Sequence, residues 1–292
     1  MKYMFLRYPG GKFKAVTFSY DDGSVHDVRF VDTLNKYGLK ATFNFHNSVV
    51  TSPSPDKISI EDINEKIYGM GHEVAVHGRC HAALGVTPSF NAVREVVEGR
   101  LCLEKAFDRI IRGFVYPDTM KFICGEKYES IKSYLKELSL VYARVANTDF
   151  HDYLKESDAY CLPSDFYFWV PTAHHDNKKI FEYMDAFLAL DETKIYRASR
   201  HPRLFYIWGH TSEFESKGHW GHLEEICEKI SGKEDTWYAT NIEIYDYVKA
   251  YESLVLSADG TKVYNPTLQK IWFTADNVLY SVESGETVTI LD

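Results

Sequence analysis

The chain has 292 residues, of which 45% are hydrophobic and 26% charged, which is enough apolar material for one large domain or two small ones. Acidic residues outnumber basic ones by 42 to 33, giving a formal charge of -9. This balance argues against binding to nucleic acid through phosphates or to an anionic membrane, and a neutral or weakly cationic small molecule fits it better.

The N-terminal residues 1–16 contain no apolar stretch of signal-peptide length, and no later run approaches the roughly 20 apolar residues of a membrane span. We therefore expect a cytoplasmic protein. The five cysteines are odd in number and lack CxxC spacing, so they indicate neither a disulfide framework nor a cysteine zinc site. The sequence carries no signal for an oligomeric state.

Short β-type runs alternate with longer helical runs along most of the chain. In chain order we expect a strand over 15–19, a helix over 28–37 ended by Gly38, a strand over 40–45, a helix over 61–70, a strand over 73–76, a helix over 89–109, a strand over 113–116, a helix over 126–138 and a strand over 141–144. Residues 146–172 are less regular and indicate loops. A helix over 177–190, a strand over 204–208, a helix over 220–231, a strand over 237–239 and a helix over 241–253 follow.

This alternation predicts parallel strands joined by crossover helices, and about seven such units favour a distorted (β/α) barrel over residues 1–253. The pattern changes after residue 253. Residues 254–292 contain short alternating runs separated by Asp-Gly, Asn-Pro and Ser-Gly turns, which predict a small β appendage of roughly three or four strands. About forty residues are marginal for independent folding, so we expect the appendage to pack on the barrel.

Two adjacent carboxylates, Asp21 and Asp22, follow the first expected buried strand and precede Gly23. In a parallel barrel this position is the carboxyl-terminal rim, where active sites lie. Consecutive side chains point in different directions there, so one carboxylate can bind a metal while the other faces a substrate. An ordinary turn that caps the next helix is the alternative interpretation.

Histidines follow two other expected strands at the same rim. His77 and His81 have the i, i+4 spacing that can present two imidazoles to one zinc ion, although a chain with 12 histidines also produces such pairs by chance. His210 ends the late apolar strand. A single histidine is usually structural, but this one shares its barrel face with the other two motifs.

Together, these motifs resemble carbohydrate esterase family 4, the polysaccharide deacetylases. The resemblance covers about residues 15–251. The segment from Phe18 to Gly23 is similar to the family's Thr-Phe-Asp-Asp-Gly, with Tyr20 in place of the usual phenylalanine.

The resemblance implies a role for each matched residue. Asp21 is the catalytic base, Asp22, His77 and His81 bind a divalent metal, and His210 is the general acid. Two imidazoles and one carboxylate suit Zn2+ and leave a coordination position for water, whose pKa a bound zinc lowers from about 15.7 toward 7.

The chain departs from the family pattern at three places. Gly78 stands where a serine or threonine usually follows the first metal-binding histidine, so a hydroxyl that would stiffen the loop is missing. The family's Arg-x-Pro-Tyr segment is altered: we expect Arg112 to reach Asp21 and hold it ionised, and the backbone N–H of Asp118 to serve as an oxyanion donor. The family's groove motif is not evident. The candidate substrate-binding residues in these two segments are Tyr116, Asp118 and Trp169, with His174 and His175 nearby.

The resulting hypothesis is a metal-dependent hydrolase that removes N-acetyl groups from N-acetylglucosamine-containing oligo- or polysaccharide. One alternative is a hydrolase of a non-sugar amide or cyclic ureide on the same fold. A second alternative is a catalytically silent carbohydrate-binding protein. The altered arginine and Ser/Thr positions favour the silent protein, whereas the presence of every expected ligand, base and acid favours an enzyme.

Overall fold

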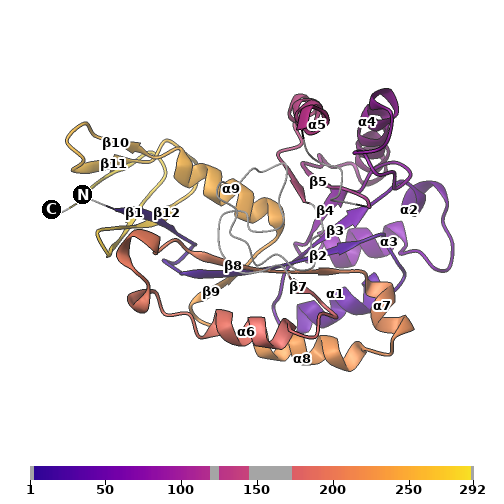
Figure 1. Cartoon of the computed structure of the whole chain (residues 1–292), viewed down its shortest axis with the longest axis horizontal. Helices are drawn as coiled ribbons and strands as arrows, with labels where there is room; N and C mark the ends of the chain where they lie inside the picture. Colours follow the sequence, from indigo (N-terminus) through magenta and orange to yellow (C-terminus); the bar gives the residue numbers. More distant parts are fainter. Residues whose placement is uncertain (1–2, 119–124, 145–172, 291–292) are drawn as a thin grey trace.

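The computed structural model describes residues 3–118, 125–144 and 173–290. Its centre is a sheet of parallel strands that curls into a half-barrel with helices packed outside it, an α/β architecture that confirms the expected fold class (Figure 1). The strand order is β6 (Tyr142–Arg144), β5 (Gly113–Val115), β4 (Glu73–Val76), β3 (Ala41–Phe45), β2 (Lys14–Asp21), β8 (Arg203–Gly209) and β7 (Ala173–His174), and β9 (Thr236–Tyr238) also pairs with β2.

Strand β2 pairs with three other strands of this sheet, and every one of its residues is buried. It pairs with β8 along one side, and on the other with β9 near its start and with β3 near its end. All of these pairs are parallel, so the carboxyl ends of the strands meet at one rim.

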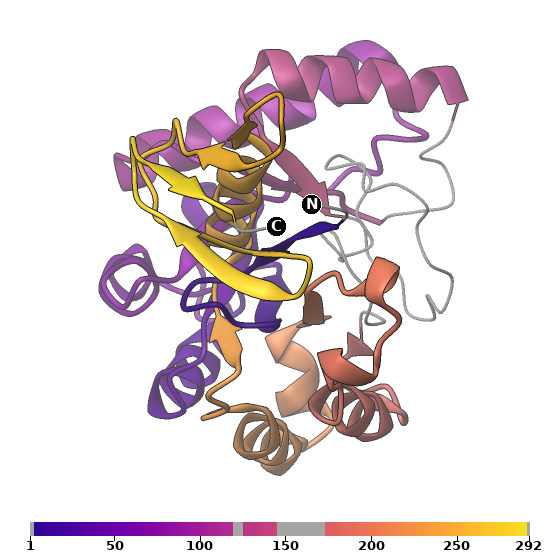
Figure 2. The same ribbon diagram turned by 90° about the vertical axis from the view of Figure 1, so that its left-hand side faces the viewer.

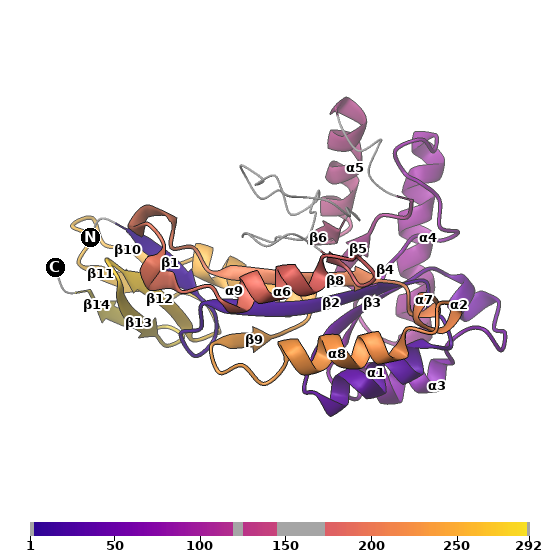
Figure 3. The ribbon, with the colours of Figure 1, turned by 60° about the horizontal axis from the view of Figure 1, so that its bottom comes forward.

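Helices surround the strands when the molecule is seen end-on (Figure 2), and α1, α3 and α8 lie together on one side of the sheet (Figure 3). The helical elements are α1 (Asp27–Lys36), α2 (Ser48–Thr51), α3 (Ile60–Asp62), the π-helix η1 (Ile63–Tyr68), α4 (Ser89–Phe107), α5 (Gly125–Glu137), α6 (Ile180–Leu188), the short 3-10 turns η2 (Glu192–Lys194) and η3 (Arg197–Ser199), α7 (Thr211–Ser216), α8 (Trp220–Ile230) and α9 (Asn241–Glu252). No helix among the described residues is long and apolar enough to cross a membrane.

Each strand and helix expected within the described residues before residue 254 is present, with ends shifted by a few residues. The helix expected over 61–70 is not a regular α-helix: it begins with the short α-helical turn α3 and continues as the π-helix η1. The region expected to be loop-rich, 146–172, lies outside the described residues. The short elements β1 (Met4–Arg7), α2, β7 and α7, each between two and six residues long, were not expected from the sequence.

The C-terminal segment, expected to be a small β appendage of three or four strands, contributes five strands to two small antiparallel sheets in the described part of the chain. Strands β10 (Val255–Leu256), β11 (Lys262–Tyr264) and β14 (Thr287–Thr289) make one sheet, and β12 (Ile271–Ala275) and β13 (Val278–Val282) belong to the other. The third strand of that second sheet is β1 (Met4–Arg7), from the opposite end of the chain.

Tyr247 on α9 connects this second sheet to the rest of the fold. Its buried hydroxyl donates to the carbonyl of Arg7 at 3.0 Å and accepts the N–H of Trp272 at 2.9 Å. The appendage and the barrel also share one hydrophobic cluster, in which Phe273 and Val263 are buried with Tyr206 and Leu204 of β8.

Glu73 at the start of β4 provides a test of packing at the end of the barrel opposite the rim. Burial raises the pKa of its carboxyl to about 7, although hydrogen bonds from Tyr142, the Ile242 N–H and Thr42 oppose the shift. Because this pKa lies above the ordinary 4.5, folding favours the protonated form. The contribution of Glu73 to stability is complete below about pH 4.5 and is lost as the pH rises through about 7.

We predict that Glu73→Gln gains stability relative to the wild type as the pH rises across this window. A glutamine does not titrate, and it keeps the three contacts if the Tyr142 hydroxyl turns to accept a hydrogen bond. Urea unfolding of both proteins at about pH 4.5 and about pH 8 measures the change. A difference in unfolding free energy that does not vary with pH would contradict the prediction.

Candidate active site

The end of β2 turns two adjacent carboxylates in different directions. Asp21 points into the barrel, where its Oδ1 accepts a hydrogen bond from Asn44 Nδ2 at 2.7 Å and forms an ion pair with Arg144. The next residue, Asp22, has a left-handed backbone with φ of 80°, and its side chain is 39% exposed at the rim. The two adjacent carboxylates thus point in different directions, as expected from the sequence: Asp21 is buried and Asp22 faces the rim.

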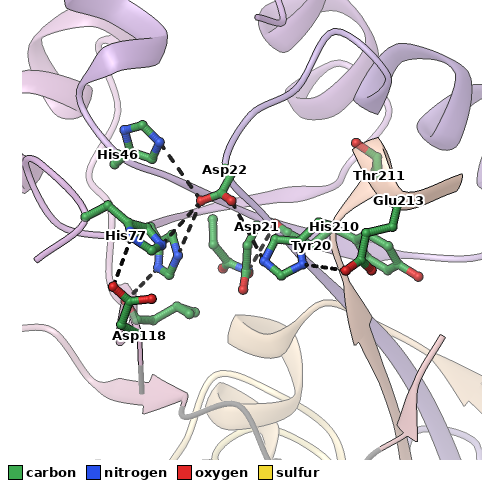
Figure 4. A network of polar contacts seen from close by, with 12 residues as sticks. Tyr20, Asp21, Asp22, His46, His77, Asp118, His210, Thr211 and Glu213 are labelled. Atoms are coloured by element: carbon green, nitrogen blue, oxygen red, sulfur yellow. Dashed lines mark hydrogen bonds and ion pairs between the residues drawn. The ribbon is translucent and has the colours of Figure 1, made fainter. Parts of the chain in front are cut away.

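Three histidines that follow β4 and β8 face Asp22, and Figure 4 labels His77 and His210 among them. His77 Nε2 lies 3.7 Å and His81 Nε2 3.6 Å from Asp22 Oδ1, and His210 Nε2 lies 3.8 Å from Asp22 Oδ2. The Nδ1 of His77 lies 3.0 Å from the carbonyl oxygen of Val115. Since a carbonyl can only accept, Nδ1 carries the hydrogen and the lone pair of Nε2 faces Asp22.

The loop that carries His77 and His81 is held by a carboxylate from α4. Glu95 is buried, and its Oε2 accepts the N–H of Arg79 at 3.1 Å and that of Cys80 at 2.8 Å. These bonds fix the backbone between the two histidines. Glu95 thus supplies a restraint on the loop that lacks the family's Ser/Thr hydroxyl.

A glycine at position 78 is what this loop needs. Gly78 has φ of 80°, a conformation that side chains rarely adopt. Helix α4 also approaches it closely at Gly99, where a Cβ atom would lie 2.8 Å from the Gly78 carbonyl carbon. The positive φ of Gly78 therefore allows the sharp turn, and the absence of a Cβ atom at Gly99 allows α4 to approach this loop.

His210 is held at the other side of the site by Glu213. Its Nδ1 lies 3.6 Å from Glu213 Oε1, and both residues come from the β8–α7 junction. Burial lowers the pKa of His210, but the carboxylates of Glu213, Asp21 and Asp22 outweigh this and raise it above the ordinary value. The imidazole therefore retains a proton more readily than a free histidine. Glu213 was not predicted, although its place three residues after His210 was a usable signal.

The arginine that contacts Asp21 is Arg144, and the expectation for Arg112 was wrong. Arg112 precedes β5 at the opposite end of the barrel, where it forms a bidentate pair with Asp246 at 2.7 Å. Arg144 ends β6 at the rim and is 1% exposed. Burial would raise the pKa of Asp21, but Arg144 and the nearby histidines lower it, so the carboxyl stays ionised.

The expected substrate-binding residues have different outcomes. Tyr116 is 2% exposed and packs edge-to-face on Phe114 in the barrel core, so it presents no surface to a substrate and this expectation was wrong. Asp118 is exposed, and its Oδ2 lies 3.7 Å from His81 Nδ1. Trp169 lies outside the described residues.

The indole of Trp208, which was not predicted, contacts the rings of His174 and His210.

His46, which was not expected from the sequence, is a further imidazole beside the site. It follows β3 directly, and its Nε2 lies 4.0 Å from Asp22 Oδ1. Burial lowers its pKa to about 4, with Lys57 adding to the effect, so the ring is neutral at neutral pH. A histidine that directly follows an expected strand was the available signal.

The atoms around Asp22 fit a divalent cation. One atom each from Asp22, His77 and His81 lies within 4.8 Å of the others, which is a two-nitrogen, one-oxygen set. Among the described residues, Asp22 Oδ1 is buried and has no hydrogen-bond partner. A buried carboxylate oxygen without a donor is costly, and a cation between it and the imidazoles would satisfy it.

Residues 6–139 match the family model described as Polysaccharide deacetylase. These residues belong to the polysaccharide deacetylase family. The resemblance found in the sequence motifs is thereby confirmed. No curated protein is similar enough to this chain to count as a match.

Solved structures extend the likeness to most of the chain. A putative polysaccharide deacetylase from Mycobacterium smegmatis is 17% identical, with 85% of this chain and 94% of that one covered and a TM-score of 0.55. PuuE allantoinase is 13% identical, with 82% and 91% covered and a TM-score of 0.58. Both show a shared fold. The Streptococcus pyogenes deacetylase PplD, in complex with acetate, is 17% identical with a TM-score of 0.40. The match covers 44% of this chain and 55% of that one, so it spans about half the length of PplD.

We predict that Arg144→Met and Arg112→Met differ strongly in their cost. Removing Arg144 leaves the buried Asp21 carboxylate without its cation, which costs about 3–5 kcal/mol. The Arg112–Asp246 pair is 38% and 36% exposed, so its loss costs less than about 1 kcal/mol. Urea unfolding measures the loss of unfolding free energy in both variants. Equal losses would show that the buried Arg144–Asp21 pair contributes no more to stability than the exposed Arg112–Asp246 pair.

Proposed function

We propose that this chain is a divalent-metal-dependent hydrolase that removes N-acetyl groups from N-acetylglucosamine-containing oligo- or polysaccharides. The observation that carries the proposal is the meeting of Asp22, His77 and His81 at the rim of the barrel. Asp21 lies next to this set in the chain, and His210 faces it from the other side. Membership of residues 6–139 in the deacetylase family supports the reaction class.

In this proposal Asp22, His77 and His81 hold the cation, and their donor set favours Zn2+. When bound, such an ion acts as a Lewis acid that polarises a carbonyl oxygen and acidifies water. Asp118 remains the proposed source of a backbone N–H toward the developing oxyanion.

Asp21 and His210 divide the proton transfers between them. Asp21, kept ionised by Arg144, accepts the proton of the attacking water. An amine leaves readily only when protonated, and His210 can deliver that proton through Nε2, the nitrogen on the side of Asp22. Glu213 at Nδ1 stabilises the charged imidazole and orients it.

Acetate release from chitin oligosaccharides tests the proposal directly. Hydrolysis of allantoin with no acetate release would instead support the cyclic-ureide alternative. Binding of the oligosaccharide without any turnover would support a silent carbohydrate-binding protein.

We predict that Asp21→Asn abolishes acetate release and leaves the bound metal nearly unchanged, because Asp21 contacts Arg144 and Asn44 rather than the histidines. The matched control is Asp22→Asn, which should lose metal as well as activity. Metal analysis by mass spectrometry, together with acetate release, separates the two roles. Metal lost from the first variant and kept in the second would show that the roles are reversed.

We also predict that His210→Ala lowers the rate on N-acetyl substrates by about 100- to 10,000-fold, the usual effect of a positioned acid. The loss should be much smaller for an acetate ester of an acidic phenol, because that leaving group departs as a stable anion. Comparing the two rates in one preparation makes the assay independent of the fraction of folded protein. Equal losses on both substrates would reject the acid assignment.

A further inference from the structure

A second group of metal-binding side chains lies beside the first, on the far side of His210. His174 ends β7, His210 follows β8, and Glu213 lies in the first turn of α7. One nitrogen or oxygen from each lies within 4.8 Å of the others. The proposed reaction uses His210 and places Glu213 behind it, but it gives no role to His174.

The contacts of Glu213 are close, yet they do not form hydrogen bonds. Its Oε2 lies 3.0 Å from His174 Nε2 and 3.1 Å from His175 Nε2. Within the described part of the chain, Glu213 Oε2 and His175 Nε2 are nevertheless buried atoms without a hydrogen-bond partner. The nitrogens therefore approach this oxygen without directing an N–H at it.

Ligands of a common cation show this combination of short separation and poor hydrogen-bond geometry. For a tetrahedral ion with bonds of about 2.0–2.1 Å, the ligand atoms lie about 3.3–3.4 Å apart and their lone pairs point at the ion. Glu213 Oε2 lies 3.0 Å from His174 Nε2, and the other oxygen, Oε1, lies 3.6 Å from His210 Nδ1, so the two distances are on either side of that value. Asp22 Oδ1, unpartnered between His77 and His81, has the same character in the first group.

The surroundings of His174 also suit a ligand. Its Nδ1 contacts the carboxylate of Asp176, which is in turn paired with Lys217. The backbone N–H of Asp176 also lies 3.4 Å from this Nδ1. Binding of a cation at Nε2 requires the hydrogen to be on Nδ1, where the Asp176 carboxylate can accept it. Metal-binding histidines are commonly oriented by such a carboxylate.

We propose that His174, His210 and Glu213 form a second cation site for a zinc-class ion, adjacent to the site at Asp22. Two imidazole nitrogens and one carboxylate oxygen are the same donor set as in the first site. Ligation of His210 through Nδ1 keeps the hydrogen on its Nε2, the nitrogen that faces Asp22. A cation at Nδ1 takes the place of the proton that this nitrogen carries in the charged imidazole, so occupation of the second site and proton donation by the charged His210 exclude each other.

Metal stoichiometry tests the second site without an activity assay. The full chain is stripped with a chelator, reloaded with Zn2+, separated from free ion and analysed by mass spectrometry. We expect two zinc ions per chain in the wild type, one in His174→Ala and one in Asp22→Asn. His219→Ala, which removes an exposed histidine outside both groups, is the matched control and should keep two. Glu213→Gln, of nearly equal size, repeats the test if His174→Ala does not fold.

The outcomes separate this inference from the proposed function. One zinc ion in the wild type, lost in Asp22→Asn and kept in His174→Ala and Glu213→Gln, would overturn the second site and leave the first intact. One zinc ion lost in His174→Ala and kept in Asp22→Asn would overturn the first site and support the second. A second ion that is lost in His219→Ala would be adventitious surface binding and would also overturn the inference.

Discussion

The buried ion pair between Arg144 and Asp21 determines how the rim of the barrel is arranged. Arg144 is 1% exposed, and a charge at that depth is stable only beside a partner. Asp21 therefore turns inward, where Asn44 also donates to it. Its neighbour Asp22 then faces the opposite way, with a left-handed backbone that costs about 1–3 kcal/mol. The position of the carboxylate among the histidines is thus a consequence of a charge pair inside the barrel.

Much of the fold could be predicted because its strands and helices are signalled locally. Buried runs such as β2, and amphipathic helices ended by glycine, are visible within ten residues of sequence. Since all strands of the central sheet are parallel, motifs that follow predicted strands reach the same rim, and for this reason Asp22, His77 and His210 come together. The short strand β1 could not be predicted in this way, because its partner β12 lies at the other end of the chain.

Two predictions about the site were wrong. One placed Arg112 at the wrong end of its strand, and the other gave the side chain of Tyr116 the wrong direction. Arg112 and Arg144 flank neighbouring strands, but the first precedes its strand and the second ends its strand, so only Arg144 is at the rim. Attention to strand direction would have favoured Arg144. Tyr116 immediately follows a strand, and its ring turned to the core side. Glu95 could not be found from sequence, because its role depends on where α4 packs against a loop.

The pairing of β1 with β12 has a consequence for the way the molecule forms. Met4 lies opposite Ala275, so the sheet joins segments separated by almost the whole chain. During synthesis β1 leaves the ribosome long before β12, and it has no partner in this sheet until β12 has been made. Contacts between such distant segments form slowly, because a long loop must close before they are gained. The last steps of folding therefore occur after translation of the barrel strands, and until then β1 has an unpaired edge that a second nascent chain can capture.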